Sequence, residues 1–263
     1  MRKRITQLVL LDLAFLLIMT VSGGIGGAFG LAVHYCAYLL PFAIGMMIIR
    51  RDECPMQLSP IPRGMLRALA LYAPTLLLII GISSVISALL ALFGKTNLTD
   101  VSGPIFVALL RHALLPAVLE ELLFRYIPMR LLGARSPRAA VFVSSLLFAL
   151  IHVNLFQIPY ALFAGAVLAC ITIGTGSIVP AMLLHFVNNA ISVFWMRSPT
   201  AAPLIIIAAL AVLLVPSIGY IAWKRRNYLA DLRRCFSGER VGFPPEMIVL
   251  TILCLSCAVF ALR

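Results

Sequence analysis

Apolar runs of membrane-spanning length follow one another along almost the whole chain. Crossing about 30 Å of hydrocarbon takes roughly 20 predominantly apolar residues in a helix. The sequence therefore predicts an all-α, polytopic integral membrane helix bundle with eight or nine transmembrane helices. The candidate spans lie at about residues 7–22, 27–49, 68–93, 104–129, 138–154, 157–174, 178–196, 201–223 and 246–262, by the length rule.

Composition supports this prediction. Hydrophobic residues make up 62% of the chain and charged residues only 11%, with a mean hydropathy of +1.07. About one quarter of the residues of soluble globular domains are charged. Disordered, collagen-like and disulfide-scaffold classes are excluded on the same grounds.

The net charge of +12 is a signal of membrane topology. Basic residues gather in alternate segments between the apolar runs, around residues 2–4, 50–67, 125–138 and 224–240. Cytoplasmic loops carry such a surplus of Lys and Arg, so we expect the N-terminus in the cytoplasm and, with nine helices, the C-terminus outside. Membrane lipid is therefore the expected partner of the basic residues, and nucleic acid is not.

The chain shows short loops and no soluble domain, which favours a bacterial cytoplasmic membrane as its location. We predict three parts: N-terminal transmembrane helices in residues 1–103, a four-helix catalytic core in 104–197 and two C-terminal helices in 198–263. The division follows the polar residues inside the spans, since burying an ionisable group in a membrane is costly and usually serves a function. Most of these polar residues lie between residues 111 and 189. The sequence assigns no role to four of the full set: Asp12, His34, Arg111 and His112.

Two adjacent glutamates stand near the middle of this polar set. Glu121 and Arg125 are four residues apart on a helix and can pair, whereas Glu120 points about 100° away. A carboxylate without that counter-ion suits a general acid or base. The alternative is that both glutamates pair with basic residues at the cytoplasmic rim.

Two histidines and an asparagine complete the polar set. His152 follows an otherwise apolar run, and His185 and Asn189 are one helical turn apart. A histidine and an asparagine that converge can donate hydrogen bonds to a developing oxyanion. The alternative for each residue is a packing or interhelical polar contact, which contributes about 0.6 kcal/mol in such settings.

Depth in the membrane decides whether these groups can meet. If Arg111 and Arg130 reach opposite interfaces, the span between them is about 28 Å and Glu120 lies near its middle. Residues 104–110 then lie partly at the interface, and a kink at Pro116 helps to bring the histidines to Glu120.

Three ordered motifs carry a family resemblance. Glu-Glu-x-x-x-Arg at 120–125, Phe-x-x-x-His at 148–152 and His-x-x-x-Asn at 185–189 resemble the CAAX-protease and bacteriocin-processing family, also called Abi. The likeness extends from about Val118 to Ile191. Tyr126 and Ala149 stand where the family often has glycine, and we expect Tyr126 to narrow the cavity.

The resemblance implies an intramembrane endopeptidase that cuts a membrane-associated or lipidated protein or peptide. Glu120 and His152 would activate a water, while His185 and Asn189 would stabilise the oxyanion. Glu121, Arg125 and Phe148 would support them. No cofactor is required in this scheme; a zinc ion on Glu120, His152 and His185 is the alternative.

Two other classes of protein remain open at this stage. A non-catalytic membrane immunity or scaffold protein could use the same motifs only to pack its helices. An ion-coupled transporter also uses buried His, Glu and Asn, but no inverted repeat is visible in the sequence.

Overall fold

The structure is a computed structural model that describes most of the chain. Described are residues 1–49, 64–66, 68–70, 72, 75, 79, 82–83, 85–86, 89, 92–93, 101, 103–197, 202–239, 242 and 244–260. These residues form helices and turns but no β-strand, which confirms the predicted all-α bundle. Much of the predicted span 68–93 lies outside the described residues.

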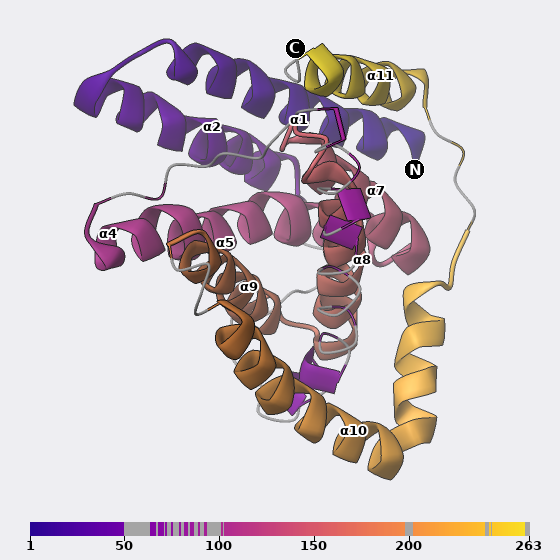
Figure 1. The fold of residues 1–263 in the computed structure, drawn as a ribbon. Helices are drawn as coiled ribbons and strands as arrows, with labels where there is room; N and C mark the ends of the chain where they lie inside the picture. Colours follow the sequence, from indigo (N-terminus) through magenta and orange to yellow (C-terminus); the bar gives the residue numbers. More distant parts are fainter. Residues whose placement is uncertain are drawn as a thin grey trace.

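The described helices follow the predicted spans closely (Figure 1). Among them, α1, α2, α8 and α9 are long and apolar enough to cross a membrane. The chain is therefore an integral membrane helix bundle. The helices are α1 (Arg2–Gly23), α2 (Gly27–Ile48), α7 (Pro137–Leu150), α8 (Ile158–Thr175), α9 (Val179–Arg197), α10 (Ala202–Cys235) and α11 (Pro245–Phe260).

One continuous helical segment replaces the predicted span 104–129. It consists of α4 (Ile105–Leu109), the π-helical turn η1 (Leu110–Leu114), α5 (Leu115–Glu121), a second π-helical turn η2 (Leu122–Tyr126) and α6 (Ile127–Leu132). The irregularity that the sequence suggests at Pro116 takes the form of η1, which ends two residues before this proline. Proline cannot donate the backbone bond of a regular helix, and π turns often mark functional sites.

One predicted boundary is wrong, and one predicted loop is partly helical. Helix α7 ends at Leu150, so His152 lies in the following turn and not within the helix. Helix α10 is interrupted by non-helical backbone angles at Lys224, so the predicted end of the apolar span at residue 223 coincides with a kink. Beyond the kink, basic residues that the sequence analysis assigned to a loop form helix as far as Cys235, since Lys and Arg are good helix formers.

Loops predicted to share one side of the membrane lie together. At one end, the Arg4 guanidinium donates to the carbonyl of Leu131 (2.6 Å). At the same end, the Ser136 hydroxyl, which also caps α7, donates to the carbonyl of Glu239 (2.9 Å). Arg197 binds the carbonyl oxygens of Val101 and Gly103 at the other end.

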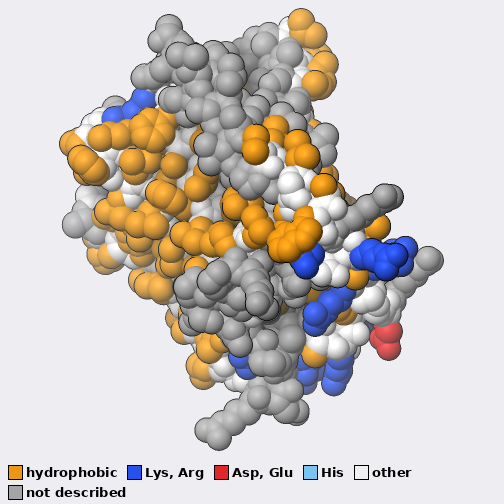
Figure 2. Space-filling model, turned by 90° about the horizontal axis from the view of Figure 1, so that it is seen from below, with side chains coloured by type: hydrophobic (Ala, Val, Ile, Leu, Met, Phe, Trp, Pro, Cys, Tyr) orange, Lys and Arg blue, Asp and Glu red, His pale blue; other side chains and the backbone are white. Residues whose placement is uncertain are grey.

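The surface has the character of a membrane protein. Figure 2 shows one face on which hydrophobic side chains cover most of the described area, while Lys and Arg gather mainly along one side. Large apolar side chains such as Met47 (85% exposed) and Phe106 (81% exposed) point outward. Lipid provides the apolar environment that such exposed side chains need.

Helices α7 and α8 pack closely in the centre of the bundle (Figure 1). The absence of a side chain at Gly165 permits this contact, because a Cβ there would lie 3.1 Å from Cδ1 of Phe148 and 3.2 Å from Cα of Ser145. Small residues at helix interfaces allow such approaches in membranes. The close packing holds the Phe148 ring in place beside the polar residues of the bundle.

Candidate active site

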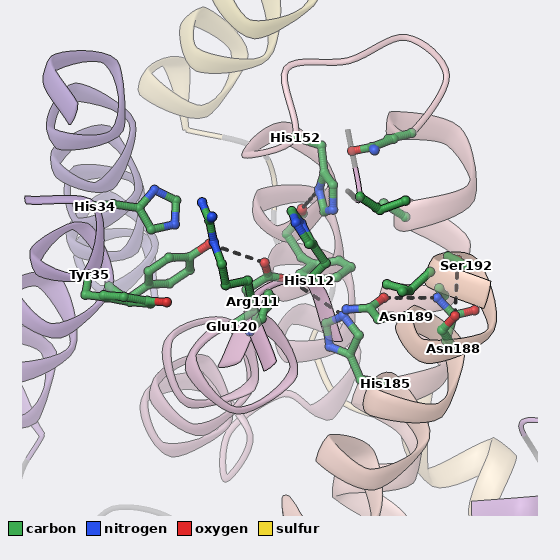
Figure 3. A pocket seen from close by; sticks show the side chains of 18 of the residues that line it. His34, Tyr35, Arg111, His112, Glu120, His152, His185, Asn188, Asn189 and Ser192 are labelled. Carbon is green, nitrogen blue, oxygen red and sulfur yellow. Dashed lines mark hydrogen bonds and ion pairs between the residues drawn. The ribbon is translucent and has the colours of Figure 1, made fainter. Parts of the chain in front are cut away.

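A cavity of about 600 Å³ opens among α2, α5, α8 and α9. It is lined by all four residues predicted to be catalytic, Glu120, His152, His185 and Asn189, and by the predicted support Phe148. Figure 3 shows the labelled polar side chains around it, which come from helices far apart in the sequence. The structure thus brings the predicted set together around one space.

The buried ion pair of the site joins Glu121 and Arg125. Arg125 Nε lies 3.4 Å from Glu121 Oε2, and both side chains are fully buried. The guanidinium also stands over the Phe148 ring, with Cζ 4.3 Å from the centroid, and donates to the carbonyl of Phe124. This confirms the pairing predicted from the four-residue spacing.

His185 stands between the two glutamates. Its Nδ1 lies 3.0 Å from Glu121 Oε1, and its Nε2 lies 3.7 Å from Glu120 Oε2. The His185 ring also meets the Phe148 ring edge to face, with centroids 5.5 Å apart. A carboxylate can only accept, so Nδ1 carries a proton and Nε2 is directed toward Glu120.

Glu120 faces the cavity and has a second partner that sequence reasoning missed. The hydroxyl of Tyr38, on α2, donates to Glu120 Oε1 at 3.4 Å. Tyr38 is held by ring contacts with Phe15 and His34. The two residues are 82 positions apart, so no local pattern in the sequence could have revealed this contact.

His152 has a fixed orientation although it lies beyond the end of α7. Its Nδ1 lies 2.9 Å from the carbonyl oxygen of Phe148, and its ring contacts the Phe148 ring, with centroids 5.2 Å apart. The carbonyl can only accept a hydrogen bond, so the proton of a neutral imidazole lies on Nδ1. The lone pair is then on Nε2, as a proton acceptor requires.

Asn189 lines the cavity together with His185, which lies one helical turn earlier on α9. The side-chain amide of Asn188 donates to Asn189 Oδ1 at 3.3 Å. With this amide assignment, the NH₂ group of Asn189 remains a donor toward the cavity. Asn188 is a supporting residue that the sequence analysis left without a role, although its position beside Asn189 was a signal.

A three-ligand metal site does not fit this arrangement. Among the described residues, no three His, Cys, Asp or Glu side chains are placed so that they could hold a metal ion. His185 uses Nδ1 for Glu121 and directs Nε2 at Glu120.

Other predictions about the surroundings of the site have mixed outcomes. Tyr126 does not line the cavity, so the expected narrowing is wrong; its hydroxyl accepts from Arg130 Nη1 (3.3 Å) and its ring faces Phe42. His34, Arg111 and His112, which had no predicted role, do line the cavity. Asp12 is buried elsewhere, on α1.

The fold and the site together define an all-α membrane protein whose buried acid–imidazole cluster borders an internal cavity. Residues 101–191 match the model of the family described as type II CAAX prenyl endopeptidase Rce1-like. The matched segment contains all three motifs, which confirms the resemblance seen in the sequence. No curated protein and no solved structure matched the chain.

Proposed function

We propose that the chain is an intramembrane endopeptidase that hydrolyses a peptide bond of a membrane-associated or lipidated protein or peptide. The observation that carries the proposal is the cluster of Glu120, His152, His185 and Asn189 around one cavity, within the segment that matches the family. The family description names a prenyl endopeptidase, so prenylated chains are the first substrates to test.

Water activation is assigned to Glu120 and His152. Glu120 accepts one proton from water and later delivers it to the leaving amine, while Nε2 of His152, whose Nδ1 is engaged by Phe148, accepts a hydrogen bond from that water and orients it. Positioned acid–base groups of this kind contribute about 10²–10⁴-fold to a rate. The ring contact between Phe148 and His152 supports this orientation.

Oxyanion stabilisation is assigned to His185 and Asn189. His185 donates to Glu121 from Nδ1, so its donation from Nε2 to an oxyanion uses the imidazolium form. The Asn189 amide supplies the second donor. Donors fixed before the reaction stabilise developing charge without the cost of reorienting solvent.

Water activation without a metal is part of the proposal, and it rests on the contacts of His185 with both glutamates.

We also propose that the protein lies in a bacterial cytoplasmic membrane with its N-terminus in the cytoplasm, from the short loops and the basic segments. Interactions between predicted same-side loops, such as Ser136 with Glu239, support this topology.

The test is cleavage of a panel of farnesylated, acylated and unmodified membrane peptides by the full chain in liposomes, with products identified by mass spectrometry. We expect internal cleavage by the wild type, loss in Glu120→Gln and His152→Gln, and no loss in Asp12→Asn, a matched change at another buried acid. Cleavage that survives a strong chelator supports activation without metal. Loss on chelation with recovery on adding zinc would contradict it.

The outcome that overturns the peptidase proposal is absence of cleavage by folded wild-type protein across the panel. A cellular phenotype that persists in Glu120→Gln would then favour the scaffold alternative. Flux of ions into vesicles that disappears in Glu120→Gln would instead favour the transporter alternative.

A further inference from the structure

The cavity holds a second polar group at a distance from Glu120. Arg111, on η1, and His34, on α2, both line it. Figure 3 shows the Arg111 side chain reaching toward the side of the cavity where His34 and Tyr35 lie.

Arg111 differs from Arg125, Arg130 and Arg197 in that its guanidinium has no partner among the described residues. Arg125 pairs with Glu121, Arg130 binds Tyr126, and Arg197 binds two backbone carbonyl oxygens. Arg111 forms no hydrogen bond or ion pair with any residue that the structure describes, and its side chain is exposed to the cavity. A charged residue within a membrane protein usually faces a partner or a pathway.

The position of Arg111 relative to Glu120 follows from the helix that carries both. Arg111 precedes Glu120 by nine residues, or about 13 Å along the axis at 1.5 Å per residue. In a regular α-helix nine residues make two and a half turns and would place the two side chains on opposite faces. The π turn η1 takes up about one extra residue and brings Arg111 round to the cavity.

Arg111 is not the counter-ion of Glu120. Among the described residues, the Glu120 carboxylate contacts His185, whose Nε2 lies 3.7 Å from Oε2, and accepts from the Tyr38 hydroxyl at 3.4 Å. The guanidinium therefore remains available for an anion that enters the cavity, at a fixed distance from the reacting centre.

We propose that Arg111, assisted by His34, is a subsite for a carboxylate of the peptide substrate. The inference rests on the proposed peptidase function. A guanidinium matches a carboxylate with two parallel hydrogen bonds, which gives direction as well as affinity. In an extended peptide at about 3.3 Å per residue, 13 Å corresponds to about four residues from the cleaved bond. The carboxylate is either the C-terminal group or an acidic side chain at that position.

The test compares three short farnesylated, fluorescein-labelled peptides that differ only in this carboxylate. One ends in a free carboxylate about four residues after the cleaved bond; the second ends there in an amide; the third is the amide with a Glu side chain at that position. Binding is measured by fluorescence anisotropy in detergent. The Glu120→Gln protein is used because it should bind the peptide without cleaving it.

We expect the two carboxylate peptides to bind roughly ten- to hundredfold more tightly than the amide, as for a charge-assisted hydrogen bond. Arg111→Gln should abolish this preference, Arg111→Lys should keep part of it, and Arg135→Gln, an exposed arginine outside the cavity, should keep all of it. In cleavage assays, Arg111→Gln should raise KM for the carboxylate peptides and leave kcat within about twofold.

Equal binding of the acid and amide peptides, or a preference that survives Arg111→Gln, would overturn the subsite. If Arg111→Gln in detergent binds phosphatidylglycerol more weakly than the wild type does, with phosphatidylcholine binding and the peptide preference unchanged, Arg111 is assigned to a lipid headgroup and the subsite is overturned as well. An Arg111-dependent preference without any cleavage by the wild type would refute the peptidase and leave the subsite standing.

Discussion

Two buried acidic residues in this bundle have opposite surroundings. Glu121 is paired with Arg125 and accepts from His185, so its carboxylate is held from its own helix and from α9. Asp12, on α1, is 1% exposed, and neither of its oxygens has a hydrogen-bond partner among the described residues. Burial of an acidic side chain therefore does not by itself identify this site. What distinguishes the site is that its acidic side chains have partners from several helices.

The comparison also separates two kinds of energetic effect. Removing one member of a buried pair leaves an uncompensated charge, whereas changing an acid that has no partner breaks no bond. The predictions below test this difference, in order of expected size.

Arg125→Leu should have the largest effect on stability. It leaves Glu121 buried without its counter-ion and removes the guanidinium from the Phe148 ring, so we expect a loss of about 3–5 kcal/mol in the free energy of unfolding. Unfolding by SDS in mixed micelles measures it. The double variant with Glu121→Gln should recover part of the loss, and a fully stable Arg125→Leu protein would contradict the prediction.

Gly165→Ala should destabilise the contact that holds Phe148. Its Cβ would lie 3.1 Å from Phe148 and 3.2 Å from the backbone of Ser145, and overpacking of this kind costs about 1–3 kcal/mol. The matched control is Gly174→Ala on the same helix, which meets no atom within 4 Å and should be neutral or stabilising. Equal unfolding curves for the two variants would show that α7 and α8 do not need the close approach.

Tyr38→Phe should have a modest effect on catalysis. The variant keeps the ring but removes the hydroxyl that donates to Glu120, and the loss of one hydrogen bond corresponds to a roughly two- to tenfold lower kcat. Tyr126→Phe, which removes a buried hydroxyl outside the cavity, serves as the control in the same liposome assay. A kcat equal to that of the wild type would remove Tyr38 from the positioning of Glu120.

Asp12→Asn should have the smallest effect. No hydrogen bond is lost, so we expect the free energy of unfolding to change by less than about 1 kcal/mol and the cleavage rate to stay the same. SDS unfolding and the peptide assay measure the two quantities. A large loss of stability would show that Asp12 has a partner of the kind that Glu121 has, and the comparison would fail.

Much of this site could be predicted from local spacing. The four-residue intervals from Glu121 to Arg125 and from His185 to Asn189 place each pair on one helical face, and both predictions agree with the structure. The apolar runs located the helices because a membrane imposes their length. The division into parts at residues 103 and 197 stays a prediction.

The rest depends on how distant helices meet. The bond from Tyr38 to Glu120 and the placement of His185 between two glutamates depend on the register of α2 and α9 against α5, which no local pattern encodes. The turn that carries His152 was read as helix because the apolar run continues past Leu150. The π turn η1, which brings Arg111 to the cavity, has no clear signature in sequence apart from the nearby Pro116.

The central claim is that adjacent glutamates have separate roles: Glu120 in the chemistry and Glu121 in the structure. The most direct measurement compares Glu120→Gln and Glu121→Gln for unfolding in SDS and for cleavage rate per folded molecule. The account predicts that Glu120→Gln stays folded and loses about 10²–10⁴-fold in rate, whereas Glu121→Gln loses mainly stability. A Glu120→Gln protein that cleaves at the wild-type rate per folded molecule would contradict it.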